Sequence, residues 1–225
     1  MAETASRRPI KQRSSGWAKW MAGRLAEADT SPDLISAASV AVSVLGAALL
    51  LWAGATAEPF LRAALFVAAG VCIPLRLLCN LLDGMVAVEY GRGSSAGPIW
   101  NELPDRFSDV AVLVGAGYAV SSSGFGVGAP LGWTCAVLAL STAYVRELGH
   151  GLGFPADFSG PFAKQQRMLT LTAAAAVSAV EPLWGWRGQS MLIALVIIGL
   201  GTAFTTARRT RTLALRLAER AGPEA

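Results

Sequence analysis

Six long apolar stretches constrain the fold of this chain more than any other feature of its sequence. They run approximately over residues 34–53, 60–82, 106–122, 127–148, 167–183 and 189–207. A helix needs roughly 20 apolar residues to cross the hydrocarbon core of a bilayer. The sequence therefore predicts an all-α integral membrane protein with six transmembrane helices, which together form one domain over residues 34–207.

The overall composition supports a membrane location. Hydrophobic residues make up 53% of the 225 positions and charged residues only 15%, whereas a soluble domain carries about a quarter charged residues. The three cysteines lie inside apolar stretches and form no CxxC pair, so neither a disulfide nor a zinc site is expected. These features disfavour a water-soluble enzyme, a DNA-binding domain and a disulfide scaffold.

The net charge of +4 is concentrated at the two ends of the chain. The basic residues at these ends are Arg7, Arg8, Lys11, Arg13, Lys19, Arg24, Arg208, Arg209, Arg211, Arg216 and Arg220. Such clusters flank transmembrane helices on the cytoplasmic side, where lipid head groups are anionic. This distribution favours the bilayer over nucleic acid as a partner, and it predicts cytoplasmic N- and C-termini with a basic tail over residues 208–225.

The segment before the first apolar stretch, residues 1–33, is predicted to form a cytoplasmic basic arm that contains a short helix. Between Gly16 and Ala28 the apolar side chains, including Trp17 and Trp20, recur at helical spacing among charged ones. This pattern is typical of an amphipathic helix lying in the membrane interface. A disordered basic arm is the alternative interpretation.

Polar side chains lie where two apolar stretches approach the predicted cytoplasmic loop 89–104. On one face of the second stretch, at steps of four, three and four, are Arg76, Asn80, Asp83 and Ala87. At steps of four along the start of the third stretch are Asn101, Asp105 and Asp109. Polar groups at membrane depth are costly and usually functional. Their position predicts a site on the cytoplasmic side.

Carboxylate and amide oxygens in this arrangement are the ligands that Mg²⁺ or Mn²⁺ prefers. The small residues Gly84, Ala87 and Gly97 leave room beside the acids for a phosphorylated ligand to approach the backbone. Simple ion pairing is the alternative interpretation. In that case Asp83 would pair with Arg76, and Asp105 or Asp109 with Arg106 or Arg92.

At these residues the sequence resembles the CDP-alcohol phosphotransferases, the membrane enzymes of phospholipid head-group synthesis. Their signature is Asp, two residues, Asp-Gly, two residues, Ala-Arg, eight residues, Gly, three residues, Asp, three residues, Asp. The matching positions, without insertion or deletion, are Asn80, Asp83-Gly84, Ala87-Val88, Gly97, Asn101 and Asp105. A second register, with Asn101 at the glycine and Asp105 and Asp109 as the final acids, lengthens the spacer by four residues and ranks below the first.

The resemblance implies the reaction and its components. A phosphatidyl or related group passes from a CDP-linked lipid to an alcohol, which is itself phosphorylated in some members, and CMP is released. The four signature acids hold two metal ions, and the last acid, Asp105 here, deprotonates the alcohol. Family members are commonly homodimers. Because Asn80 and Asn101 replace two of the acids and Val88 replaces the arginine, one or two ions are expected, and Asp109 is a possible accessory acid.

Four basic residues are predicted to bind phosphate groups of the substrates, namely Arg76, Arg146, Lys164 and Arg167. For Lys164 and Arg167, ordinary flanking charge is an equal alternative. Two other functions also stay open for the chain as a whole. One is a family member that binds nucleotide or lipid without transferase activity, which the Asn substitutions suggest, and the other is a small transporter.

Overall fold

The computed structural model describes residues 11–222, and this part of the chain is all-helical, as predicted. The α-helices are α1 (Gly16–Glu27), α2 (Pro32–Ala55), α3 (Pro59–Glu89), α4 (Gly97–Ser122), α5 (Gly128–Gly151), α6 (Lys164–Val180) and α7 (Gln189–Ala221). Two short 3-10 helices complete it, η1 (Lys11–Ser14) and η2 (Glu181–Trp184). The first ten residues of the predicted basic arm, with Arg7 and Arg8, and the last three of the predicted tail lie outside the described residues.

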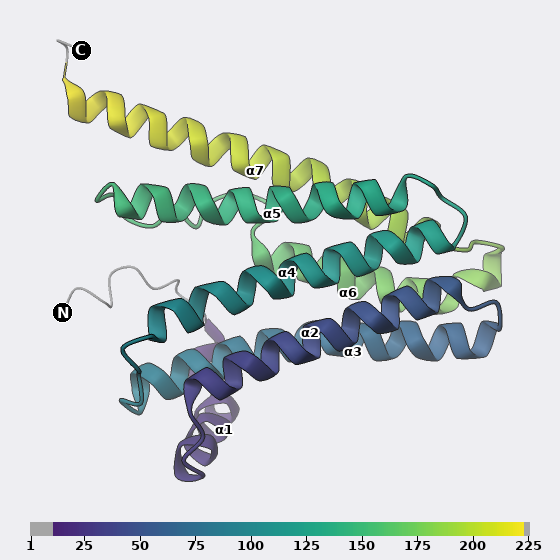
Figure 1. Ribbon diagram of the computed structural model, residues 1–225, viewed down its shortest axis with the longest axis horizontal. Coiled ribbons are helices and arrows are strands. Elements are labelled where there is room, and N and C mark those ends of the chain that lie inside the picture. Colours follow the sequence, from purple (N-terminus) through teal and green to yellow (C-terminus); the bar gives the residue numbers. More distant parts are fainter. Residues whose placement is uncertain (1–10, 223–225) are drawn as a thin grey trace.

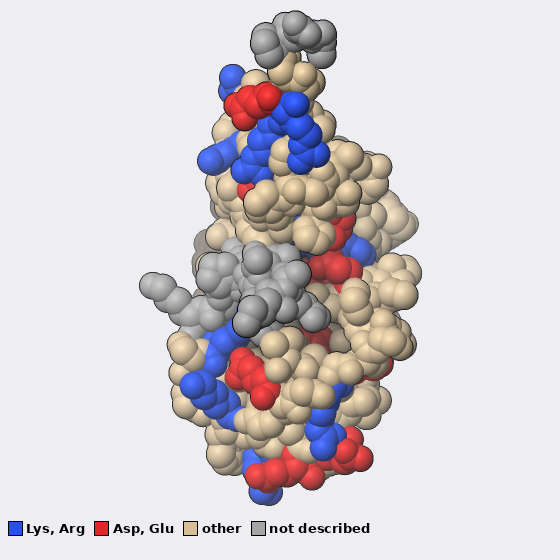
Figure 2. All heavy atoms as spheres, turned by 90° about the vertical axis from the view of Figure 1, so that its left-hand side faces the viewer, with Lys and Arg blue, Asp and Glu red and all other residues tan. Residues whose placement is uncertain are grey.

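Helices α2 to α7 run up and down beside one another as a bundle (Figure 1). One end of the bundle carries α1, the α3–α4 and α5–α6 loops and the last turns of α7, and we call it the charged end. Lys, Arg, Asp and Glu side chains gather on this face (Figure 2). The opposite end carries the short connections 56–58, 123–127 and 185–188. Helix α6 starts well inside the bundle, so the loop before it reaches inward (Figure 1).

Four helices, α2, α3, α5 and α7, are long and apolar enough to cross a membrane. All six predicted stretches coincide with helices, but α4 already begins at Gly97 and α7 continues past residue 207 to Ala221. The predicted tail is therefore helical as far as Ala221, and it continues α7 beyond the bundle. The crossing of all six helices stays a prediction.

Short polar motifs set where α2 and α3 begin. The Ser31 hydroxyl accepts the Leu34 N–H at 3.2 Å, and Pro32 is the first residue of α2. The Glu58 carboxylate accepts the N–H groups of Phe60 and Leu61, again before a proline at the first helical position. N-terminal caps satisfy amides that lack helical partners, and proline at this position has no amide to satisfy.

Glycines let α4 pack against its neighbours with direct backbone contact. A Cβ atom on Gly54 of α2 would lie 2.3 Å from the carbonyl oxygen of Ala119, and one on Gly117 would lie 2.8 Å from the Cα of Gly132 in α5. Close approach of small residues is the usual basis of helix association in lipid, where apolar surface gives little drive. This packing fixes α4, and with it the acids of its first turns.

A buried ion pair ties the opposite end together. Arg62 of α3 and Glu181 of η2 lie 2.9 Å apart, and both side chains are buried. Arg62 also donates to the carbonyl oxygen of Ala53 at 3.1 Å, while Glu181 accepts the amides of Gly188 and Ser190. One ion pair thus connects α2, α3, η2 and α7 where the connections between helices are short.

Removing one partner of this pair should destabilise the fold strongly. Glu181→Ala leaves the Arg62 guanidinium buried without its counterion, so we expect a loss of about 3–5 kcal/mol in the free energy of unfolding. Denaturant unfolding in mixed micelles measures this loss. Glu219→Ala, which removes an exposed carboxylate from α7, is the matched control, and equal stability of the two variants would contradict the interpretation.

Candidate active site

The predicted polar residues of α3 and α4 meet inside the bundle toward the charged end. Asn80 and Asp83 come from the last turns of α3, and Asp105 comes from the early turns of α4. The first residue of α6, Lys164, reaches the same place because α6 begins inside the bundle. Helical spacing of three or four residues puts each pair of acids and amides on the inner face of its helix.

Asp83 is buried and held by hydrogen bonds alone. The Ser36 hydroxyl of α2 donates to Asp83 Oδ2 at 2.6 Å, and the Gly84 N–H donates to Oδ1 at 2.5 Å. Within the described part of the chain Asp83 forms no ion pair. Its carboxylate is near enough to Asp105 for the two to interact electrostatically. Hence the pairing of Asp83 with Arg76, which the alternative interpretation required, does not form.

Asp105 has one neutral partner and two cationic partners, of which Lys164 is the nearer. The Asn80 amide donates to Asp105 Oδ1, while the Ser39 hydroxyl donates to Asn80 Oδ1 at 2.8 Å. Lys164 Nζ lies 2.5 Å from Asp105 Oδ2. Arg106 lies further away, at 3.9 Å from Asp105 Oδ2.

A second, deeper layer of charge surrounds Asp109. Arg76 donates to Asp109 Oδ1 at 2.6 Å and Arg167 donates to Oδ2 at 2.9 Å, and all three side chains are buried. Arg167 also donates to the carbonyl oxygen of Phe162 at 3.0 Å. Two of the predicted phosphate-binding residues therefore bind Asp109, which acts as their shared counterion. Arg92, by contrast, pairs with Asp29 at the surface.

The remaining predicted residues of α3 and α4 are Asn101 and three small residues. Asn101 is exposed, one turn before Asp105, and its side chain makes no hydrogen bond to any described residue. Gly84, Ala87 and Gly97 are half-buried. A Cβ atom on Gly97 would meet nothing closer than the Ser94 hydroxyl at 3.9 Å, so there is open space at this position.

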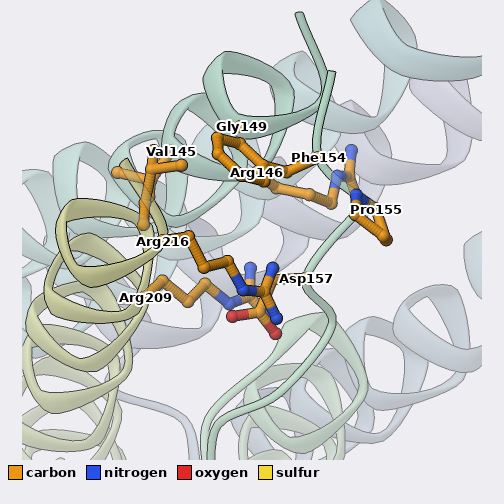
Figure 3. A pocket seen from close by; sticks show the side chains of 9 residues that line it. Val145, Arg146, Gly149, Phe154, Pro155, Asp157, Arg209 and Arg216 are labelled. Carbon is orange, nitrogen blue, oxygen red and sulfur yellow. The ribbon is translucent and has the colours of Figure 1, made fainter. Parts of the chain in front are cut away.

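Arg146 lies at the end of α5 rather than beside Asp83 and Asp105. It forms ion pairs with Glu102 at 2.5 Å and with Glu147 at 2.7 Å. It also lines a small pocket between α5, the α5–α6 loop and α7 (Figure 3). The pocket is lined by Val145, Arg146, Gly149, Phe154, Pro155, Asp157, Arg209, Leu213 and Arg216.

The electrostatics of this pocket are dominated by arginine. Burial alone would raise the pKa of Asp157, but hydrogen bonds from Ser159 and the charges of Arg209 and Arg216 outweigh burial and lower it. Arg209 is anchored by donating to the carbonyl oxygens of Ser159 and Thr142. The pocket thus has more positive than negative side chains and suits an anionic group.

Sequence reasoning missed the contribution of α2 to the site. Ser36 and Ser39 donate to Asp83 and Asn80, and Ser43 follows one turn later on the same face. The signal available in the sequence was the spacing of these serines, which lie three and then four residues apart along an otherwise apolar helix. Arg209 and Arg216 were noticed only as basic flanking charge, because nothing in the sequence places them next to Arg146.

The donor set decides how many metal ions the site suits. Among the described residues no group of three His, Cys, Asp or Glu side chains lies together as a metal site. Asp83 and Asp105 supply two carboxylates, and Asn80 and Asn101 supply amide oxygens, which are acceptable but uncharged ligands. Balancing two divalent cations would take four negative charges, whereas this site has two carboxylates, one of which already pairs with Lys164. The residues therefore fit a single Mg²⁺ or Mn²⁺ ion.

No protein-family model matches the chain, but individual proteins do. The inner membrane protein YnbA of Escherichia coli strain K12 is 28% identical over 186 residues, which cover 82% of this chain and 85% of the relative. A phosphatidylinositol phosphate synthase of Cutibacterium acnes is 28% identical over 211 residues, which cover 87% of this chain and 92% of the relative. The chain thus aligns with nearly the whole of both proteins.

Solved structures with the same fold belong to the phosphatidylinositol phosphate synthase PgsA1 of Mycobacterium tuberculosis. Its complex with manganese and citrate matches with a TM-score of 0.72 and 21% identity, covering 87% of this chain and 88% of that one. Its structure with CDP-DAG bound matches with a TM-score of 0.70 and 22% identity, covering 87% and 92%. At these identities the likeness shows a common fold.

These comparisons confirm the predicted resemblance to the CDP-alcohol phosphotransferases. The prediction of an integral membrane protein is confirmed in outline by the four apolar helices and by the similarity to an inner membrane protein. The similarity extends over most of the chain, so the likeness is not confined to the signature residues of α3 and α4.

Replacing Asp109 should lower the free energy of unfolding more than replacing Asp105. Asp109→Ala leaves two buried guanidiniums without a counterion, so we expect a stability loss of about 3–5 kcal/mol. Asp105→Ala removes a partly exposed carboxylate whose partner Lys164 is also partly exposed, so it should reduce stability less. Denaturant unfolding of both variants in mixed micelles measures the difference, and a larger loss for Asp105→Ala would contradict the assignment of Asp109 as a structural counterion.

Proposed function

We propose that the chain is a membrane CDP-alcohol phosphotransferase, which transfers a phosphatidyl or related group from a CDP-linked lipid to an alcohol and releases CMP. The observation that carries the proposal is the meeting of Asp83, Asn80 and Asp105 at the family spacing inside one end of a helical bundle. Similarity over most of their length to proteins named phosphatidylinositol phosphate synthase supports the same activity.

A divalent cation is part of the proposed site. Asp83 and Asp105 would hold it, with the amide oxygens of Asn80 and Asn101 as neutral ligands. A bound cation of this kind supplies charge neutralisation on the diphosphate of the donor. The manganese in the PgsA1 complex supports Mg²⁺ or Mn²⁺ as the cofactor. Open space at Gly97 supports entry of the donor between α3 and α4, beside Gly84 and Ala87.

Asp105 acts in this proposal as the general base. The acceptor oxygen attacks the phosphorus of the phosphatidyl group, the bond from that phosphorus to the CMP oxygen breaks, and the hydroxyl proton passes to an oxygen of Asp105. The Asn80 amide and the Lys164 ammonium orient the carboxylate by binding one oxygen each. Lys164 also supplies positive charge next to the phosphate groups.

The acceptor alcohol is proposed to carry a phosphate. The pocket at the end of α5 is lined by Arg146, Arg209 and Arg216, and Arg209 and Arg216 lie beside its one acid, Asp157 (Figure 3). Arginine binds phosphate oxygens through paired N–H groups. The name of the relatives, phosphatidylinositol phosphate synthase, supports a phosphorylated polyol as the acceptor class. Arg76 and Arg167, which bind Asp109, contribute through the deeper layer rather than by contact with substrate.

The proposed topology has six membrane-crossing helices, with both termini and the site on the cytoplasmic side. The charges that gather at one end of the bundle support this orientation (Figure 2). Helix α1 is proposed to lie in the membrane interface, because Trp17 and Trp20 are half or more exposed while Ala18 and Ala22 pack against the bundle. A homodimer is proposed from the family resemblance alone.

Labelling of single cysteines tests the orientation. In a chain whose Cys72, Cys79 and Cys135 are replaced by alanine, Ser95→Cys lies in the α3–α4 loop and Leu183→Cys in η2, and both positions are exposed. An impermeant maleimide should label the cysteine at 183 in intact bacterial cells and the cysteine at 95 only after permeabilisation. The reverse pattern would overturn the proposed cytoplasmic site.

Two other functions are distinguished by specific observations. The amides at Asn80 and Asn101 favour a protein that binds CDP-lipid without transferring it, and this remains the second candidate. A transporter is disfavoured because the buried Arg62–Glu181 pair and its hydrogen bonds close the opposite end of the bundle. The polar residues of the site therefore do not continue as a path across the bundle.

Purified protein in lipid nanodiscs with CDP-diacylglycerol, Mn²⁺ and either inositol phosphate or glycerol phosphate should release CMP. Asp105→Asn should lower this rate by at least about a hundredfold, since a general base is lost without change of size. Asp83→Asn and chelation by EDTA should each abolish release. Asp29→Asn, which removes an exposed acid at the charged end, is the control. Binding of CDP-diacylglycerol without CMP release from either acceptor would favour the binding protein.

A further inference from the structure

The Lys164 ammonium occupies a central place among the acids of the site. Its Nζ lies 2.5 Å from Asp105 Oδ2, and its charge also acts on Asp83 and on Asp109. The position follows from the fold, because the α5–α6 loop turns inward and α6 begins inside the bundle (Figure 1). A flexible surface lysine would not be held at one carboxylate in this way.

The charges around Lys164 do not leave room for two divalent cations. Asp109 is already paired with Arg76 and Arg167, so Asp83 and Asp105 are the two acids of the site that remain for a cation. At one of the other signature positions, Asn80 donates a hydrogen bond to Asp105. An aspartate there would instead repel Asp105 unless a cation lay between them. The Asn80 amide thus binds one oxygen of Asp105 and the Lys164 ammonium binds the other.

We propose that the Lys164 ammonium takes the place of a second metal ion, so that Asp83 and Asp105 hold a single divalent cation while Lys164 supplies the second positive charge at Asp105. The inference rests on the proposed function, since it assumes that this site holds a divalent cation. It also explains physically why Asn80 and Asn101 stand at two signature positions in place of acids. A chain with a fixed internal cation does not need two further carboxylates. Such carboxylates would repel Asp83 and Asp105 unless a second ion lay between them.

The number of bound Mn²⁺ ions tests the proposal directly. Electron paramagnetic resonance and equilibrium dialysis on the full-length protein in nanodiscs should give one Mn²⁺ per chain with an uncoupled, mononuclear spectrum. Two Mn²⁺ ions per chain with an exchange-coupled spectrum would overturn the proposal, and so would no bound Mn²⁺. These measurements use the wild-type chain and do not depend on whether any variant folds.

Removing the ammonium should change metal affinity in a predictable direction. Lys164→Gln should tighten Mn²⁺ binding by about tenfold, because the incoming cation no longer meets a like charge a few ångströms away. Lys164→Arg should keep the wild-type affinity. Arg92→Gln, which removes a positive charge paired with Asp29 at the same end, is the matched control. An affinity of Lys164→Gln equal to that of Arg92→Gln would contradict the role of Lys164.

Restoring the missing acids should restore the second ion. The triple variant Asn80→Asp, Asn101→Asp and Lys164→Gln should bind two Mn²⁺ ions with an exchange-coupled spectrum. One ion per folded triple variant would contradict the proposal, and size-exclusion chromatography establishes that the variant is folded. CMP release is a separate readout. One Mn²⁺ per chain with no CMP release would keep this inference while overturning the transferase function.

Discussion

Burial of charge between apolar helices governs how this molecule is built. An ion removed from water is costly unless a partner and hydrogen bonds compensate for it. The structure meets this condition at both ends of the bundle, with Arg62 and Glu181 at one end and Asp109 with two arginines toward the other. These contacts join helices that are distant in sequence, so they hold the bundle in the arrangement that the site requires.

The site is the place where this compensation is incomplete. Asp83 is buried with hydrogen bonds but no ion pair in the described chain, and Asp105 shares a single ammonium. The negative charge of Asp83, which has no ion-pair partner among the described residues, suits a divalent cation and the phosphates that accompany it. Asp109 holds Arg76 and Arg167 in fixed positions below Asp83 and Asp105, because both guanidiniums donate to its carboxylate.

This chain has the fold of PgsA1, with a TM-score of 0.72, although Asn80 and Asn101 stand at two positions that are Asp in the signature it resembles. Helix packing explains this likeness. Gly54, Gly117 and Gly132 bring backbones into contact far from the signature residues. The charge of the site can therefore change without moving the helices that present it.

The sequence by itself determined the helices, because apolar runs and capping motifs are local. It also determined that Asn80 and Asp83 share one face of their helix, because helical periodicity is fixed. The tertiary structure alone decided which charges meet. Arg76 could reach either Asp83 or Asp109 by spacing, and only the packing of α3, α4 and α6 selects Asp109. The same packing brings in Ser36, Ser39 and Lys164, since contacts between distant helices depend on how their surfaces fit together, which spacing along one helix does not specify.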